Sequence, residues 1–250
     1  MAVFQKYADY YDEIYLQKDY KKEVAFLTGV IKKYSPIKVK SILSLGCGTA
    51  SHDIVLAKKG FDVLGIDGSS KMIEIAKQKT KAENVKIDFK VADVSNFKTA
   101  KKFDFAMAMF NIAGYMIENN AMENMLKNVS KSLKKGSLLV FDAWYGPAVL
   151  KDRPQDREKK FAKDGKEITR LTTQTIDTQK SIIDITFTIK EGTKKVAQEN
   201  HPMRFWYLKE MEYFLNKNGF KMVKMCNFMD LKSTVSENKW DIFVIAEKTR

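Results

Sequence analysis

Short apolar runs alternate with amphipathic stretches along most of the chain. The runs have the length of strands, and the stretches between them place apolar residues at helical spacing. This alternation predicts an α/β fold, in which mostly parallel strands form one sheet and helices cover both of its faces. Seven strands are expected, at residues 39–45, 61–66, 85–91, 103–110, 137–142, 220–228 and 241–247. Helices are expected at residues 53–59, 119–133 and 208–217.

A different pattern separates the fifth expected strand from the helix at 208–217. Three segments there alternate between apolar and polar positions, the first two of them with several Thr residues, and turn-forming residues lie between them. They cover residues 168–176, 181–190 and 196–205. The pattern predicts an antiparallel meander, preceded by a mobile loop at 152–156. Because open parallel sheets bind ligands beyond the carboxyl ends of their strands, we expect this insertion to cap a pocket.

Aromatic residues dominate the start of the chain. Residues 4–29 read as one or two helices, and five large side chains fall at helical spacing near their beginning. These are Tyr7, Tyr10, Tyr11, Ile14 and Tyr15. Plain amphipathic packing accounts for them as well as contact with a ligand does.

The charge of the chain changes this picture little. The formal net charge is +13, from 44 Lys and Arg against 31 Asp and Glu. Only five of the basic residues are Arg, the type suited to bidentate contacts with bases and phosphates, and the Lys are dispersed. We therefore expect no nucleic-acid partner, although a positive field would attract an anionic small molecule.

The rest of the composition excludes several classes of protein. With Cys47 and Cys226 alone there is neither a disulfide framework nor a metal-binding spacing. No apolar run approaches the ~18 residues of a membrane span. The aromatic and acidic N-terminus does not have the pattern of a signal or transit peptide. We expect a cytoplasmic protein with no membrane partner, and a homodimer is left open.

The most specific signal is a glycine turn after the first expected strand. Gly46-Cys47-Gly48-Thr49-Ala50 follows the apolar run at once, and Asp67 ends the next strand roughly 20 residues later. Glycines permit a sharp turn and the close approach of a ligand, and an acid at that distance is placed to meet ribose hydroxyls. Neither G-x-G-x-x-G nor G-x-x-x-x-G-K-[ST] can be written here. An adenosine-like cofactor is expected, bound across the first two strands.

The turn G-x-G-x-A and the segments that follow it resemble the class I S-adenosylmethionine (SAM)-dependent methyltransferases. Residues 65–72 are similar to the family's G-x-D-x-S-x-x-M, and residues 92–94 to the acid after its third strand. Residues 103–105 open a similar fourth strand, and residues 133–140 resemble the turn into strand five. One departure is Ser44, which stands where the family usually has an acid two residues before the first glycine.

This resemblance implies a fold, a cofactor and a cofactor site. The fold is a Rossmann-like, seven-stranded, mostly parallel sheet with an antiparallel last strand. SAM is the methyl donor, S-adenosyl-L-homocysteine is the product, and no metal is required. The resemblance places the ribose at Asp67 and the adenine amino group at Asp93, which alternatively caps a turn. The other residues implied at the cofactor are Tyr11, Tyr20, Gly46, Cys47, Gly48, Thr49, Gly68, Met72, Ala92, Val94 and Met109.

Three further segments resemble the sugar-nucleotide N,N-dimethyltransferases of deoxyaminosugar pathways. After the fourth strand, Tyr115 stands where those enzymes have a His that faces the acceptor, and it would orient the acceptor. Two aromatic residues, Trp144 and Tyr145, fall in a segment similar to their acid-Pro-Trp-Trp, which implies substrate contacts. His201 is the candidate base and Arg204 a candidate ligand of a pyrophosphate or carboxylate, unless both are ordinary polar strand positions.

The sequence thus predicts a SAM-dependent methyltransferase that modifies N or O of a small, anionic molecule, with a nucleotide-linked aminosugar as one candidate. A methyltransferase of free amines, amino acids or a peptide N-terminus is the first alternative. A SAM-binding regulator or catalytically silent protein is an alternative of another class. Residues 1–143 and 208–250 are expected to form the SAM-binding core, with 1–34 as a helical lid and 144–207 as the acceptor cap.

Overall fold

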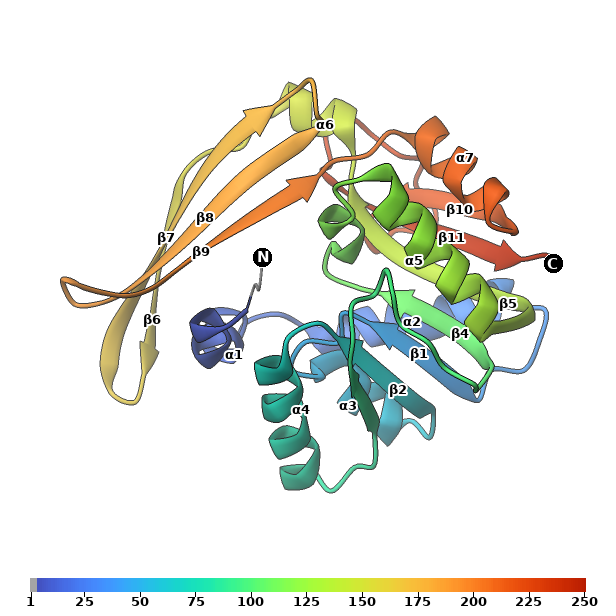
Figure 1. The fold of residues 1–250 in the computed structure, drawn as a ribbon, viewed down its shortest axis with the longest axis horizontal. Helices are drawn as coiled ribbons and strands as arrows, with labels where there is room; N and C mark the ends of the chain where they lie inside the picture. The colour runs from blue at the N-terminus through green and yellow to red at the C-terminus, as the bar shows by residue number, and fades with distance from the viewer. Residues whose placement is uncertain (1–3) are drawn as a thin grey trace.

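The computed structural model describes residues 4–250 and has the expected α/β architecture. Seven strands form one sheet in the order β10-β11-β5-β4-β1-β2-β3 (Figure 1). β1 to β5 run parallel, and β11 is antiparallel to both of its neighbours, which confirms the predicted topology. The strands are β1 Ser41–Leu45, β2 Asp62–Asp67, β3 Asp88–Val91, β4 Phe103–Ala108, β5 Leu133–Trp144, β10 Phe220–Asn227 and β11 Asp241–Lys248.

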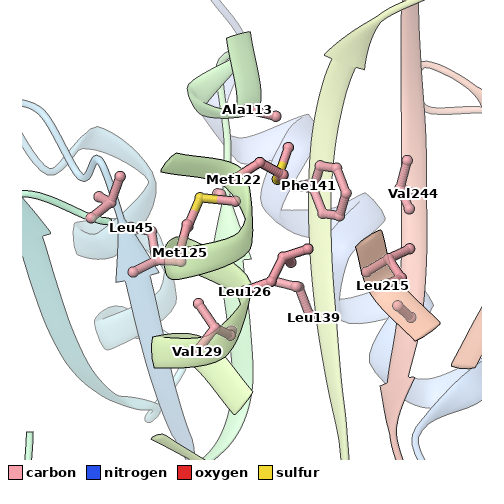
Figure 2. Close-up of a cluster of buried hydrophobic side chains, with 14 of the residues drawn as sticks. Leu45, Ala113, Met122, Met125, Leu126, Val129, Leu139, Phe141, Leu215 and Val244 are labelled. Carbon is pink, nitrogen blue, oxygen red and sulfur yellow. The ribbon is translucent and has the colours of Figure 1, made fainter. Parts of the chain in front are cut away.

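Side chains of successive strand residues point to opposite faces of this sheet. Helices pack on both faces and bury these side chains. In β1, Ile42 packs with residues of α2 and α3, whereas Leu43 belongs to the cluster under α5 and α7. Figure 2 shows the second cluster, where methionines and leucine of α5 lie against Leu139 and Phe141 of β5. The helices are α2 Tyr20–Tyr34, α3 Ser51–Lys58, α4 Ser70–Ala82, α5 Asn119–Ser132 and α7 Leu208–Lys217.

The insertion forms a second sheet that projects from the core as an arm (Figure 1). It is an antiparallel meander in the order β6-β7-β8-β9, joined to β5 through the short helix α6, Gly146–Lys151. The strands are β6 Arg157–Lys163, β7 Lys166–Asp177, β8 Ile182–Glu191 and β9 Lys194–Arg204. Three of them match the expected segments, and β6 was not expected. β6 is an edge strand of mostly exposed charged residues, so it lacks the apolar alternation that marks the others.

The start of the chain packs against both the insertion and the core, where the Thr49 hydroxyl donates to Asp12 at 2.6 Å. A 3-10 helix at Lys6–Tyr10 and the single turn α1, Tyr11–Ile14, lie beside the arm (Figure 1). Tyr7 stacks on Phe187 of β8 with ring centroids 5.1 Å apart, and Ile14 is fully buried among residues of the insertion. The N-terminal segment therefore bridges the two sheets at the carboxyl ends of β1 and β2.

Within residues 4–250, none of the helices has the length and apolar character needed to cross a membrane.

Candidate functional site

The glycine turn lies between β1 and α3, at the carboxyl edge of the sheet. Gly46 and Gly48 have φ angles of +62° and +54°, which residues other than glycine adopt at a cost. A Cβ on Gly46 would stand 2.1 Å from Cδ1 of Ile112, so the loop after β4 packs directly on the turn. No atom lies within 4 Å of the position that a Cβ on Gly48 would take. The turn thus exposes its backbone to a ligand.

Asp67 at the end of β2 holds this turn. Its Oδ2 accepts a hydrogen bond from the Gly48 amide at 2.9 Å, and its Oδ1 accepts from the Ser69 amide at 2.8 Å. Burial raises the pKa of the carboxyl, and the two backbone amides oppose that shift. Because a carboxylate offers about four lone pairs, both oxygens keep the capacity to accept from hydroxyl groups of a ligand.

Two cavities meet at this turn. The smaller has a volume of about 410 Å³ and extends along the loops after β2 and β3, past Gly68, Asp93 and Val94. The larger has a volume of about 440 Å³ and extends under the arm, past Met72, Met109 and Trp144. Both are lined by Phe4, Gly46, Asp67, Ile112 and Tyr115. An elongated molecule can therefore lie across the turn with one part in each cavity.

Most of the residues expected at a cofactor surround these spaces. Tyr11 lines the larger cavity, and it shares with Tyr20, Cys47 and Thr49 a hollow of about 30 Å³ beside the turn. Asp93 is exposed and lines the smaller cavity, while its Oδ1 also accepts from the amide and hydroxyl of Ser95 at 2.7 Å. Ala92 lines neither of the two cavities, and its amide donates to the Asp67 carbonyl at 2.9 Å.

Tyr115 stands at the junction of the cavities and touches His201 on its far side. The Tyr115 hydroxyl lies 2.9 Å from His201 Nδ1, and His201 Nε2 lies 3.4 Å from a carboxylate oxygen of Glu199. His201 is fully buried and lines neither cavity, and it contacts the cavity walls through Tyr115 and through the ring of Phe4, whose centroid lies 4.9 Å away. Burial raises the pKa of Tyr115 well above its ordinary value, which keeps the phenol protonated.

Two residues expected at the acceptor lie elsewhere. Arg204 donates to the Ile117 carbonyl at 3.0 Å and to Asn119 Oδ1 at 2.8 Å, and it also pairs with Glu210. Its guanidinium stacks over Trp206 at 4.1 Å. Neither Arg204 nor Tyr145 lines the two cavities. The guanidinium is thus engaged in joining β9 to α7 and to the loop before α5.

The larger cavity contains polar groups that the sequence analysis did not single out. On the arm, Arg170 donates to the hydroxyls of Tyr7 and Tyr15, at 3.2 and 3.3 Å, while its buried Nε has no partner among the described residues. The same is true of the hydroxyl of Thr172. On the core side, Asn111 and Asp142 leave side-chain atoms without partners. The spacing of these residues in sequence gives no signal, because they meet only in the folded chain.

Comparisons with known proteins find similarity to methyltransferases. Residues 42–136 match the family model described as "Methyltransferase domain". The dTDP-3-amino-3,4,6-trideoxy-alpha-D-glucopyranose N,N-dimethyltransferase of Streptomyces venezuelae is 22% identical over 220 residues, which cover 86% of this chain and 90% of that protein.

Two solved structures share the fold over nearly all of the chain. An S-adenosylmethionine-dependent methyltransferase from Clostridium acetobutylicum superposes with a TM-score of 0.82 at 20% identity, covering 98% of each chain. The sugar N-methyltransferase KedS8 from Streptoalloteichus sp. superposes with a TM-score of 0.79 at 16% identity, covering 100% of this chain and 95% of that one.

Proposed function

We propose that this chain, which is a class I SAM-dependent methyltransferase acting on a small molecule, methylates N or O of an acceptor bound under the arm. The observation that carries this proposal is the larger cavity, whose walls are the glycine turn with Asp67 on one side and the arm on the other. A donor held at the turn and an acceptor held under the arm would meet in one enclosed space. Such a placement brings the reacting atoms together and excludes water.

The residues at the turn fit an adenosyl group. The open backbone at Gly48 and the free lone pairs of Asp67 suit the ribose, and Asp93 is placed for the adenine amino group, beside Gly68 and Val94. Met72 and Met109 line the larger cavity, next to the turn. We assign Tyr11, Tyr20, Cys47 and Thr49, which surround the small hollow beside the turn, to the methionine end of the donor. When bound, SAM supplies a methyl group on a cationic sulfur that needs no metal for its activation.

The arm supplies polar and basic groups that could bind the acceptor. Within residues 4–250, Nε of Arg170 and the hydroxyl of Thr172 have no hydrogen-bond partner, and the exposed Arg157 lines the same cavity. These groups suit a phosphate or carboxylate on the acceptor, and they replace Arg204 in that role. Trp144 offers an aromatic wall for a ring. A nucleotide-linked aminosugar fits this arrangement, because it carries an amine and an anionic group. An amino acid also carries an amine and an anionic group, and it is the alternative acceptor.

The cofactor part of the proposal is tested by binding. Calorimetry with S-adenosyl-L-homocysteine should show saturable binding to the wild-type protein, and Asp67→Asn should weaken it at least about 10-fold, because a charge-assisted hydrogen bond contributes roughly 1.5–3 kcal/mol. Asp62→Asn, on the exposed start of the same strand, is the matched control and should bind normally. Equal affinities in the two variants would remove the assignment of Asp67.

The acceptor part is tested by turnover. The protein is incubated with SAM and dTDP-3-amino-3,6-dideoxy-α-D-glucopyranose, and in parallel with a mixture of amino acids. Mass spectrometry should detect a gain of one or two methyl groups on the nucleotide sugar. Methylation of amino acids alone would favour the alternative acceptor. Tight cofactor binding without turnover on any acceptor would contradict the proposed catalytic role of the larger cavity.

A further inference from the structure

The loop after β4 is strained at the point where it enters the larger cavity. Phe110 and Asn111 both have left-handed backbone conformations, with φ angles of +72° and +56°. Residues other than glycine adopt this conformation at a cost, and consecutive examples persist only when surrounding contacts hold them. Here Asp142, near the end of β5, provides the contact, since its Oδ2 accepts from the Asn111 amide at 2.8 Å.

The same two residues leave three buried polar atoms without hydrogen-bond partners among the described residues. These are Oδ1 of Asp142 and both amide atoms of Asn111. Asp142 is 3% exposed and Asn111 is 5% exposed, and both line the larger cavity. Buried polar groups are almost always paired, so such a cluster facing a cavity indicates that a ligand completes it.

The cluster is anionic and lies next to the glycine turn. Asp241, at the exposed start of β11, lines the same cavity and adds a second carboxyl near its mouth. Trp144 and Phe110 supply aromatic surface beside these carboxyls. Ile112, the residue after Asn111, packs on Gly46, which keeps the cluster beside the turn where the donor would lie. Carboxyl groups with aromatic walls bind organic cations.

We propose that Asn111 and Asp142 form the subsite for the acceptor atom, and that this atom is the nitrogen of an amine that enters as an ammonium cation. This inference rests on the proposed function and narrows it from N or O to N. Asp142 Oδ1 and Asn111 Oδ1 accept hydrogen bonds from the ammonium. An ammonium donates to both oxygens at once and balances the charge of the carboxylate, whereas a hydroxyl has one proton to donate and leaves that charge unbalanced.

The subsite also removes the proton that blocks an ammonium from reacting. One N–H bond breaks, its electron pair stays on nitrogen as the lone pair, and the proton forms an O–H bond with Asp142 Oδ1. The lone pair would then form a bond to the methyl carbon as the bond from that carbon to the donor sulfur breaks, with the electron pair of the broken bond staying on sulfur. The nitrogen would leave as a methylated ammonium, and Asp142 would release its proton to water. The reaction therefore needs no other base, and His201 is not required to reach the acceptor.

The electrostatics of Asp142 support this role. Burial raises its pKa to about 7, and Asp241 adds to the shift, whereas the Asn111 amide and Lys18 oppose it. Lys18 also pairs with Glu23 and lies over the ring of Phe110. Asp142 therefore changes its protonation near neutral pH, where a proton acceptor for an amine is most useful.

The test compares a ring amine with the alcohol of the same shape. Cyclohexylamine and cyclohexanol are titrated by calorimetry into the protein saturated with S-adenosyl-L-homocysteine. We expect the wild type to bind the amine at least 10-fold more tightly than the alcohol at pH 8. Affinity for the amine should fall several-fold as the pH drops from 8 to 6, because Asp142 becomes protonated, while affinity for the alcohol should stay constant.

Two variants assign the effect to the subsite. Asp142→Asn keeps an oxygen for the Asn111 amide but loses the charge, so it should bind amine and alcohol alike and lose the pH dependence. Asn111→Gly removes the side chain and suits the backbone conformation, so it should weaken amine binding about 3- to 10-fold even if the first variant folds poorly.

The outcomes separate this inference from the function on which it rests. Failure of S-adenosyl-L-homocysteine to bind would overturn the proposed function. Normal binding of that compound, together with no preference for the amine or with a preference that survives both substitutions, would overturn only the subsite.

Discussion

Glu199 on β9 accepts a hydrogen bond of 2.6 Å from the amide of Phe4, which lies 195 positions earlier in the chain. The same carboxylate accepts from the amides of Gln5 and Tyr7, at 2.9 and 3.1 Å, and faces His201. Phe4 lines both cavities, and its carbonyl accepts from the Ser69 hydroxyl at 2.8 Å. One side chain of the arm thus holds the N-terminal segment over the site.

Replacing this carboxylate should loosen the segment. Glu199→Gln retains one accepting oxygen for three backbone amides, so at least one bond is lost. We expect affinity for S-adenosyl-L-homocysteine to fall about 10-fold, because a hydrogen bond to a charged group contributes roughly 1.5–3 kcal/mol. Hydrogen exchange of residues 4–10 should accelerate. The control is Glu191→Gln, which contacts this segment only through the Tyr10 hydroxyl; an equal effect there would contradict a specific role for Glu199.

The hydroxyl of Tyr115 should matter for turnover and not for cofactor binding. Tyr115→Phe keeps the ring that lines both cavities but removes the contact with His201 Nδ1. Since Tyr115 stays protonated, we expect it to orient the acceptor as a hydrogen-bonding group, and its loss should lower kcat by about 10-fold. Calorimetry with S-adenosyl-L-homocysteine should give the wild-type affinity, and a large loss of that affinity would place the hydroxyl at the cofactor instead.

Arg204 should behave as a residue of the fold. It joins three neighbours by hydrogen bonds and covers Trp206, so Arg204→Ala leaves buried acceptors unpaired. We expect the free energy of unfolding in urea to fall by about 2–4 kcal/mol. The affinity of the folded variant for an anionic acceptor should change little. Arg170→Lys should show the reverse pattern, and a selective loss of acceptor binding in Arg204→Ala would restore the role expected from sequence.

A buried carboxyl under the glycine turn should make stability depend on pH. Asp53 is 1% exposed, and burial raises its pKa to about 7, with Asp67 adding to the shift and a hydrogen bond from Ser44 opposing it. The folded chain therefore keeps a proton that the unfolded chain releases near pH 4.

Asp53 alone should consequently make the free energy of unfolding fall by about 1.4 kcal/mol per pH unit as the pH rises from about 4 to 7, and Asp142, whose pKa is also about 7, adds a similar slope over the same range. Asp53→Asn should remove much of this slope and raise stability at pH 8. Denaturation in urea at a series of pH values checks it, and an unchanged slope would show that Asp53 is not the group responsible.

The centre of the main sheet was predictable because β1, β4, β5 and β11 are buried on both faces and therefore read as apolar runs. The glycine turn with Asp67 was predictable because close approach of a ligand demands those residue types at that spacing. β6 was not, since an edge strand needs little apolar surface and Phe161 is its only large apolar side chain.

The acceptor region was predictable only in part. Tyr115 and Trp144 lie close in sequence to the ends of β4 and β5, where parallel sheets place their ligands, and both line the larger cavity. Arg204 and Arg170 cannot be told apart by pattern, because both are basic residues in alternating strands. The direction in which each side chain points depends on the pairing register, and that register follows from contacts between distant segments.

The position of the N-terminal segment over the site has a consequence for the order in which ligands bind and leave. Phe4 lines both cavities, and Glu199 anchors it to the arm. We therefore expect the cofactor to exchange only while the N-terminal segment is detached from the arm. An acceptor bound under the arm would make the arm more rigid, and the N-terminal segment is attached to the arm through Glu199. We therefore expect ordered binding, in which SAM binds before the acceptor and S-adenosyl-L-homocysteine is released last. S-adenosyl-L-homocysteine should then inhibit competitively against SAM but not against the acceptor.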